Sequence, residues 1–470
     1  MEGRTVAKDR LDDEAAHIAA WVLEFAGPTY GPGGGHKLIH SPDDSMLRTR
    51  SAATALRDVP MDHPGLEPYR RLAVRLQSDH GDGATTGLLL AAHLVQGALR
   101  AHAPRAALLD GFALARRQSL ATLRAVARPM EPVQLLRPVS PQDAWPEVVL
   151  AGLDRLAQQG GVRLDDVHIA PHDGAWLDGL LIEPDGPRRG VPDARVLVVD
   201  APRVKPTGDA SYRLALGQDA GGAEDADLRR LVDRVAELGV DLLVCPQALG
   251  ALKDRAGCLV LEHASKSLVA RLEAATGARR CATLHDATAT DLGRATLRPL
   301  HPRHGGWLLE GPGPGATFCI PLASPVGEAW HDEAERFLRL AGTVLADARG
   351  VPGGGRWQRR LAKTLRSAAP MAPDRSPLGV EVAARAFDRL ADHVVRNMGR
   401  DPIDEPTLDD VPDVAHCVEA TVAGAFDVAR TVLRIDARHE KAAQDRRAIR
   451  GGDAPMGSPK GMPGDIPPLM

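Results

Sequence analysis

Hydrophobic positions recur at helical spacing at both ends of the chain. Apolar side chains from Ile18 to Phe25 share one helical face, and Gly27 with Pro28 should end that helix. The same spacing predicts helices over residues 12–26, 69–76, 84–100, 104–127, 332–346, 356–368, 379–396 and 415–434. Both ends of the chain are therefore expected to be mainly helical.

The middle of the chain has a different pattern, because from about residue 165 short apolar runs alternate with helical spacing. The predicted strands are 195–199, 240–245 and 258–261, and the predicted helices are 228–238 and 267–275. Strands that alternate with helices indicate a layered α/β unit. A proline-rich stretch, 129–146, should be a connector. This order of helical, α/β and helical segments indicates one domain inserted into another.

Composition narrows the function classes. The 470 residues are 44% hydrophobic but only 3% aromatic, so Leu, Ala and Val should build a core that suits long helices. A net charge of −4 without a basic stripe argues against nucleic-acid binding, and no apolar run reaches the length of a membrane span. The five cysteines lack metal-type spacing and the first residues lack a signal-peptide core, so we expect reduced thiols and a cytoplasmic protein.

One short segment carries candidate chemistry. It consists of Gly81, Asp82, Gly83, Ala84, Thr85 and Thr86 and precedes an apolar run. Glycine lets backbone approach a ligand closely, and a helix start offers free N–H groups and a positive dipole end. A lone Asp in that setting can hold Mg²⁺ while amides and Thr hydroxyls hold phosphate oxygens. The alternative is a plain turn, since Gly-Asp-Gly is also common in turns.

Further motifs flank this hexamer in a fixed order. They are a glycine-rich loop at 31–37, Thr-Arg-Ser-Ala-Ala-Thr at 49–54, Asp-His-Pro at 62–64, Pro104 with Asp-Gly-Phe at 110–112, Val-Pro-Gly-Gly-Gly at 351–355, Asn397 with Asp-Pro-Ile-Asp at 401–404, and Leu-Arg-Ile-Asp at 433–436. Together with the hexamer they resemble the motifs of group II chaperonins, the thermosome and eukaryotic cytosolic chaperonin family. The resemblance runs along most of the chain.

The resemblance implies the chaperonin fold, a multi-domain α and α/β architecture. A helical equatorial domain would comprise residues 1–128 and 351–450, and a small intermediate (hinge) domain would comprise 129–170 and 323–350. An inserted α/β apical domain that binds substrate would span 171–322. Residues 451–470 are polar and rich in Gly and Pro, so they are expected to be a disordered tail.

The resemblance also implies a function, because such chaperonins assemble into rings that enclose unfolded protein and close by binding and hydrolysing ATP. The expected partners are therefore non-native client proteins and other subunits of a homo- or hetero-oligomeric ring. The expected cofactors are ATP and Mg²⁺, with Asp82 at the metal position. The implied cofactor-binding positions are Gly31, Pro32, Gly34, Gly81, Asp82, Gly83, Ala84, Thr85, Thr86, Gly353 and Gly354.

Two catalytic acids of the family are replaced here. Ser51 stands where one acid would be, and Leu340 stands where the hinge acid would activate water. Phosphoryl transfer depends on positioning and charge neutralisation, and a general base contributes about 10²–10⁴-fold, so hydrolysis should be weak or lost. Glu335 or Asp332 could substitute, although each lies more than one turn from the missing acid. No residue is therefore assigned as catalytic.

Nucleotide binding should be altered as well. Gly33 replaces the lysine of the glycine-rich loop, and Lys37 either matches the second lysine of that loop or is a solvated surface charge. The segment between Asp404 and Val418 is shorter than the family's, where it helps to hold the nucleoside. At the place of the family's apolar lid, residues 214–227 are rich in Gly and Asp and should be flexible.

Three functions follow from these patterns. The leading one is a chaperonin-like subunit that binds unfolded protein in a ring and binds ATP and Mg²⁺ with weak or lost hydrolysis. The alternative is a nucleotide-independent scaffold or assembly paralogue of a chaperonin. A new enzyme on the α/β layer lacks a nucleophile–base pair or cofactor loop. Five histidines lack metal-type spacing and should be structural or at the surface, namely His263, His285, His301, His304 and His331.

Overall fold

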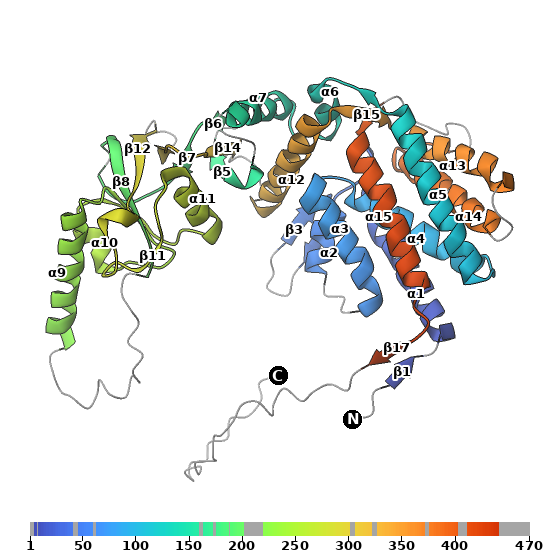
Figure 1. Ribbon diagram of the computed structural model, residues 1–470, viewed down its shortest axis with the longest axis horizontal. Coiled ribbons are helices and arrows are strands. Elements are labelled where there is room, and N and C mark those ends of the chain that lie inside the picture. The colour runs from blue at the N-terminus through green and yellow to red at the C-terminus, as the bar shows by residue number, and fades with distance from the viewer. Residues whose placement is uncertain are drawn as a thin grey trace, which may run out of the picture.

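The computed structural model describes residues 4–6, 8–40, 46–59, 63–158, 163–172, 175–187, 189–201, 220–300, 306–321, 327–371, 376–402 and 411–440. These residues form three units, which Figure 1 shows joined in an arch. The helical unit comes from both ends of the chain, the inserted unit from the middle, and the connecting unit lies between them. Each unit has a hydrophobic core of its own.

The helical unit packs helices from both chain ends around one core. Its main helices are α1 (Lys8–Ala26), α2 (Ala52–Asp58), α3 (Glu67–His80), α4 (Ala84–Arg100), α5 (Arg105–Val126), α13 (Arg356–Ala368), α14 (Pro377–Asn397) and α15 (Ala415–Leu433). Segments separated by more than 200 residues in the sequence therefore share a single core.

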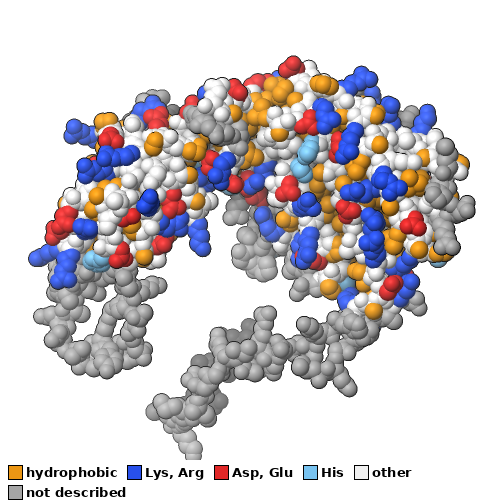
Figure 2. Space-filling view, viewed as in Figure 1, with side chains coloured by type: hydrophobic (Ala, Val, Ile, Leu, Met, Phe, Trp, Pro, Cys, Tyr) orange, Lys and Arg blue, Asp and Glu red, His pale blue; other side chains and the backbone are white. Residues whose placement is uncertain are grey.

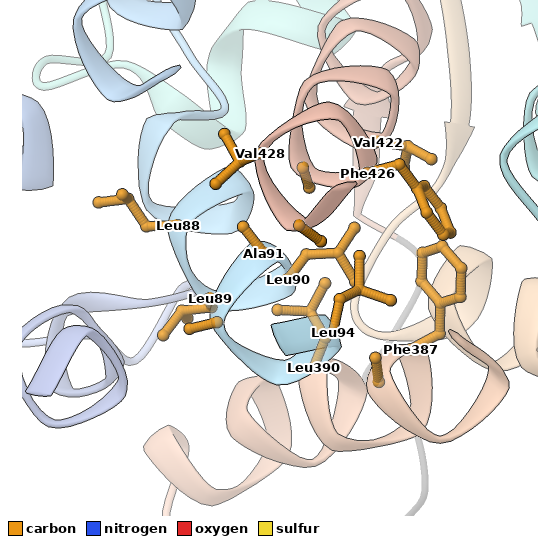
Figure 3. Packing of buried hydrophobic residues seen from close by; sticks show 14 of the residues in the cluster. Leu88, Leu89, Leu90, Ala91, Leu94, Phe387, Leu390, Val422, Phe426 and Val428 are labelled. Atoms are coloured by element: carbon orange, nitrogen blue, oxygen red, sulfur yellow. The ribbon is translucent and has the colours of Figure 1, made fainter. Parts of the chain in front are cut away.

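Helix α4 is the central helix of this unit. It is apolar around its whole circumference, and residues 88–92 have 0% exposure, so neighbours must cover it on all sides. Figure 3 shows Leu90 and Leu94 of α4 close to Phe387 of α14 and Phe426 of α15, whose rings lie 6.2 Å apart. This packing fixes the helix whose N-terminal end carries the Gly-Asp-Gly segment.

The connecting unit packs three helices on a small sheet. The helices are α6 (Pro132–Leu136), α7 (Trp145–Gln158) and α12 (Gly327–Ala346), and the strands are β5 (Val167–His172), β14 (Ala316–Pro321) and β6 (Trp176–Leu177), in the order β5-β14-β6. Trp145 packs edge-on against Phe318 at 5.0 Å and also contacts Phe337 at 5.6 Å. This aromatic cluster joins segments from three parts of the sequence.

A second small sheet marks where the chain passes between the helical and connecting units. It contains β16 (Pro412–Val414), β15 (Arg349–Pro352) and β4 (Arg128–Pro129) in that order, all antiparallel. The chain leaves the helical unit at β4 and returns at β15. The two crossings are hydrogen-bonded to each other, which limits how the units can move apart.

The inserted unit is a seven-stranded mixed sheet with helices on it. The strands are β10 (Leu259–Leu261), β9 (Leu242–Val244), β8 (Val191–Ala201), β12 (Gly293–Pro299), β13 (Trp307–Glu310) and β7 (Leu180–Ile182) in order, with β11 (Cys281–Thr283) also paired to β8. The helices are α9 (Ala220–Leu238), α10 (Ala251–Arg255) and α11 (Lys266–Thr276).

Both faces of this sheet are buried. Val196 and Val198 of β8 enter one core, while Leu197 and Val199 enter the other, as the two-residue period of a strand requires. Helix α11 contributes to the first core, and α9 and α10 contribute to the second. The continuous apolar run of β8 is therefore explained by burial on both sides.

Two short ribbons project from the helical unit. One pairs β1 (Arg4–Val6) with β17 (Arg438–Glu440), and the other is the hairpin of β2 (Lys37–His40) and β3 (Met46–Thr49). Figure 1 shows the β1–β17 ribbon at the lower end of this unit. The first and last described strands thus lie together.

The predicted fold class is confirmed, since helical units from both chain ends flank an inserted α/β unit. Helices predicted at 84–100 and 356–368 have those bounds. Two expectations were wrong in part. The connector 129–146 contains helix α6, and residues 220–227, expected to be flexible, are helical, because α9 begins at Ala220 and runs on into the helix predicted from 228. Residues 214–219, 404 and 451–470 lie outside the described residues.

The surface carries charges of both signs. Figure 2 shows Lys and Arg side chains interspersed with Asp and Glu on the face in view. Many of them form ion pairs, such as Arg124 with Glu419 at 2.8 Å. None of the helices in the described part of the chain is long and apolar enough to cross a bilayer.

Candidate nucleotide site

A cavity of about 570 Å³ lies where the helical and connecting units meet. The helical unit supplies the loop after α1, the Gly-Asp-Gly segment and the start of α15. The connecting unit supplies one face of α12. A ligand here would touch both units at once.

Two glycines let the surrounding elements come close to the segment before α4. Gly81 has φ +74° and ends α3, and a Cβ there would lie 2.6 Å from the backbone nitrogen of Leu340 and would overlap the carbonyl oxygen of Arg336. Gly83 has φ +90°, and a Cβ there would overlap Thr421 Oγ1. Each position therefore requires glycine for two reasons. The backbone is left-handed, and α12 approaches closely at Gly81 and α15 at Gly83.

The N-terminus of α4 has free donors. Gly83 is the N-cap and has no side chain to cap the helix, and the first intrahelical bond runs from the N–H of Gly87 to the carbonyl of Gly83 at 2.8 Å. The N–H groups of residues 84–86 therefore have no partner within the helix. Asp82 lines the cavity beside them, and its carboxylate forms no hydrogen bond or ion pair with another described residue. Free amides next to a carboxylate suit phosphate and a cation.

Another part of the cavity lining is aromatic and polar, and it reaches the start of α4, where Tyr30 interacts with Thr86. Gln358 Nε2 donates to Tyr30 Oη at 3.1 Å, and Trp357 Nε1 donates to Asp413 Oδ2 at 2.8 Å. Burial, and then the charge of Asp413, raise the pKa of Tyr30 well above its ordinary value. The phenol is therefore a neutral group at physiological pH.

Several buried groups of the cavity are poised for a polar ligand. Thr421 Oγ1 and Gln358 Oε1 both line the cavity, are buried, and have no hydrogen-bond partner among the described residues. Burial, and then the charge of Asp82, raise the pKa of the Cys417 thiol well above its ordinary value, so this lining group is neutral. Buried polar atoms normally have partners, so the two orphaned atoms mark where a ligand can bind.

The glycine-rich loop is held by an unexpected residue. Gly31 and Pro32 line the cavity, and Arg50 donates to the carbonyls of Gly31 and Pro32 at 3.2 and 3.4 Å. Lys37 instead lies 4.4 Å above the ring of Phe25 and does not line the cavity. The position of the family's second lysine is thus a cation–π contact in this chain.

Of the two positions where the family has a catalytic acid, only one lines the cavity in this chain. Ser51 does not line the cavity, because it is the N-cap of α2, accepts from the N–H of Thr54 at 3.2 Å and hydrogen-bonds Gln77. Leu340 does line it and is 3% exposed. The position that would carry the water-activating acid is therefore apolar.

The acids proposed as substitutes point elsewhere. Asp332 pairs with Arg57 at 2.8 Å, Glu335 pairs with Arg339 at 2.7 Å, and neither lines the cavity. Glu333 does line it, and the sequence reasoning missed it. The available signal was helical spacing, because Glu333, Arg336, Phe337 and Leu340 stand at i, i+3, i+4 and i+7 on one face of α12.

The predicted cofactor-binding residues divide into two groups. Those that line the cavity are Gly31, Pro32, Gly81, Asp82, Gly83, Thr85, Thr86 and Gly354. Gly34, Ala84 and Gly353 do not. A Cβ at Gly34 would overlap the backbone of Thr29, and a Cβ at Gly353 would overlap the carbonyl of Val411, so these glycines allow close backbone packing.

One histidine lies near two carboxylates. Ligand atoms of His331, Asp332 and Glu335 lie within 4.8 Å of one another. Both carboxylates already pair with arginines, Arg57 and Arg339, and His331 is exposed. We therefore interpret the two carboxylates as members of ion pairs, one that joins α12 to the helical unit and one within α12. His301 and His304 lie outside the described residues.

The residues present fit a nucleotide with a magnesium ion. Asp82 would hold the ion, the free N–H groups at the start of α4 would hold phosphate oxygens, and the orphaned Thr421 hydroxyl lies behind them. A magnesium ion in such a site neutralises phosphate charge. Thr85 and Thr86 add two hydroxyls to the same wall.

A helical unit from both chain ends, an inserted α/β unit, and a cavity suited to phosphate between the helical and connecting units define a chaperonin subunit. The chain belongs to the TCP-1/cpn60 chaperonin family, whose sequence profile matches residues 22–139 and 154–408. It is 28% identical to thermosome subunit beta of Desulfurococcus mucosus over 449 residues, covering 85% of this chain and 88% of that one. It is 26% identical to the thermosome subunit of Methanopyrus kandleri, covering 85% and 82%.

A solved structure agrees with this assignment. The fold is similar to the crystal structure of a group III chaperonin in the open state, with a TM-score of 0.73 and 18% sequence identity. The similarity covers 92% of this chain and 99% of that one. The resemblance to thermosome-type chaperonins inferred from the motifs is confirmed.

Proposed function

We propose that this chaperonin-family subunit binds ATP with Mg²⁺ in the cavity, hydrolyses it weakly or not at all, and assists the folding of non-native protein within a ring. Membership of the family supports a chaperonin-like role in protein folding. The single observation that carries the nucleotide part is the uncapped start of α4 beside Asp82, which opens into a cavity of about 570 Å³.

The predicted roles follow from the chemistry of each wall. Asp82 is the acid placed to hold the metal, and the amides of residues 84–86 are placed to hold phosphate. Gly354 and Asp413 line the part of the cavity expected to accept the nucleoside. Each of these roles is a prediction for this chain.

Weak hydrolysis is supported by the face that α12 presents. Leu340 cannot accept a proton, and Ser51 is engaged in capping α2. Glu333 is the acid that α12 presents to the cavity, but it lies nearly two turns before Leu340. Without a positioned base, a loss of about 10²–10⁴-fold in rate is expected.

A nucleotide-independent scaffold or assembly paralogue is the alternative, and a titration separates the two. We expect wild type to bind Mg-ATP saturably in calorimetry and Asp82→Ala to bind at least about tenfold more weakly, since a charge-assisted contact is lost. Asp79→Ala is the matched control, because Asp79 lies three residues away on α3 and pairs with Arg75. No binding by wild type, or equal affinity in Asp82→Ala, would contradict the proposed site and favour the scaffold.

Hydrolysis is tested at position 340. Leu340→Asp returns a carboxylate to the wall of the cavity, whereas Leu340→Asn has the same shape without the charge. We expect the rate of phosphate release to rise at least about tenfold over wild type in Leu340→Asp and to stay unchanged in Leu340→Asn. A tenfold gain is small beside the full contribution of a general base. Rapid turnover by wild type would show that another group activates water.

A further inference from the structure

Three arginines line the cavity, and they are the only Lys or Arg side chains among its described lining residues: Arg48, Arg50 and Arg336. Arg50 is engaged, since it donates to the carbonyls of Gly31 and Pro32. Within the described part of the chain, the side chains of Arg48 and Arg336 form no hydrogen bond or ion pair. Two guanidinium groups in the cavity therefore lack an anionic partner.

Both arginines line the cavity at or near α12. Helix α12 packs directly on Gly81, where its backbone at Arg336 and Leu340 would contact any Cβ. The α12 backbone at Arg336 therefore lies beside Gly81, next to Asp82, and Arg336 is one of the residues that line the cavity. Arg48 approaches from β3, which contacts α12.

The local charges around Arg48 are consistent with this placement. His36 lines the same part of the cavity, and burial, then Arg48 and Arg50, hold its pKa below the ordinary value, whereas Glu333 acts in the opposite direction. His36 is therefore neutral near pH 7, and the positive charge at this end comes from the arginines. Their planar groups can each hold two oxygens of a phosphate.

The glycine-rich loop supplies no cation that could take their place. Gly33 carries no side chain, and a Cβ there would overlap the carbonyl of Asn397. Lys37 lies over Phe25 instead. The positive charge that the phosphate tail requires beyond the metal must therefore come from α12 and β3.

We propose that Arg336 and Arg48 bind the terminal phosphate of a nucleoside triphosphate, so that the cavity selects a triphosphate over a diphosphate. The inference rests on the proposed nucleotide site and adds the residues that distinguish its ligands. In this arrangement the terminal phosphate lies beside α12. Because Arg336 belongs to the connecting unit, the same contact ties that unit to the ligand on the helical unit.

Calorimetric titration of Mg-ATP and Mg-ADP into wild type, Arg336→Gln and Arg48→Gln tests the proposal. We expect wild type to bind Mg-ATP at least about tenfold more tightly than Mg-ADP, and each variant to lose most of that ratio by weakening Mg-ATP alone. Arg339→Gln is the control, because Arg339 lies on the same helix but bonds Ser78 and Glu335 outside the cavity. Its ratio should equal that of wild type.

The outcomes separate this inference from the proposed function. Binding of neither nucleotide by wild type would overturn the proposed site and, with it, the inference. Binding of both nucleotides with a ratio that Arg336→Gln and Arg48→Gln leave unchanged would overturn the inference alone. If thermal unfolding shows that Arg336→Gln does not fold, Arg48→Gln still tests the inference. Arg48 is exposed on the β2–β3 hairpin, so its replacement should leave the fold intact.

Discussion

The core of the helical unit contains a buried histidine, His93. It lies on α4, is 6% exposed, and neither ring nitrogen has a hydrogen-bond partner among the described residues. Its ring lies 5.3 Å from that of His393 on α14. Burial, and then the neighbouring His393, lower the pKa of His93 to about 3. The ring is therefore neutral in the folded protein at any pH at which the chain would be handled.

This burial predicts acid sensitivity. Above pH 6.5 His93 is neutral in both states and contributes nothing, but below that pH the unfolded chain binds a proton that the folded protein does not. The free energy of unfolding should therefore fall by about 2 kcal/mol at pH 5 through this residue. Chemical denaturation at pH 7.5 and pH 5 should show a smaller loss in His93→Leu than in wild type. An equal loss in both would contradict the prediction, and exposed His285→Leu is the control.

The cavity forms because helix α12 packs against the helical unit. Helix α12 is held against the helical unit by the Arg57–Asp332 pair at 2.8 Å and by Arg339, which donates to the carbonyl of Ser78 at 3.1 Å. The close approach at Gly81 completes this contact. Without it, Glu333 and Arg336 would not line the same cavity as Asp82.

Gly81→Ala should break this docking. Gly277 is a matched control, because it also ends a helix, has φ +73° against +74° for Gly81, and would place a Cβ in open space with no atom within 4 Å. Gly277→Ala should cost about 1 kcal/mol, the strain of a left-handed alanine. Gly81→Ala should cost more and should also increase hydrogen exchange in α12, because its Cβ overlaps the Arg336 carbonyl. Equal effects of the two variants would show that the contact is unimportant.

The sequence predicts where helices lie along the chain better than it predicts which of their faces contact other parts of the fold. Repeated apolar spacing was sufficient for helices such as α4 and α13. The face that α12 turns to the cavity depends on contacts with α3, more than 250 residues away, and the sequence therefore does not show that Glu333, and not Glu335, lines the cavity. Ser51 was recognised as a missing acid, but its role as the cap of α2 became visible only with Thr54 and Gln77 in place.

At the scale of the whole molecule, three units are joined in series, and the chain crosses twice between the helical and connecting units. The sheet of β4, β15 and β16 joins both crossings to the start of α15, which also lines the cavity. A ligand that touches α12 and α15 together would therefore act at the point where the units meet. This arrangement supports a coupling of nucleotide occupancy to the position of the inserted unit, which a change in hydrogen exchange of the connecting unit on addition of Mg-ATP would reveal.

The two ribbons are the best candidates for contacts between subunits. Each has only two strands in the described chain, and such short ribbons are marginal alone but can add to the edge of another sheet. Leu38 and Met46 lie on one face of the β2–β3 hairpin and are 65% and 66% exposed. Exposed apolar side chains next to open strand edges favour association with another copy of the chain.

Charging this face should weaken the assembly. We expect wild type to sediment as a ring-sized oligomer, and Leu38→Lys with Met46→Lys to shift the dissociation constant at least about tenfold toward smaller species, because lysines would have to be desolvated at the contact. Leu378→Lys, at a position 43% exposed on α14, is the control and should sediment like wild type. A monomeric wild type would contradict the ring, whereas an unaffected oligomer in the double variant would move the contact away from the hairpin. Because Leu38 faces Arg48 across the hairpin, subunit contact there would also place a neighbouring chain at the rim of the nucleotide cavity.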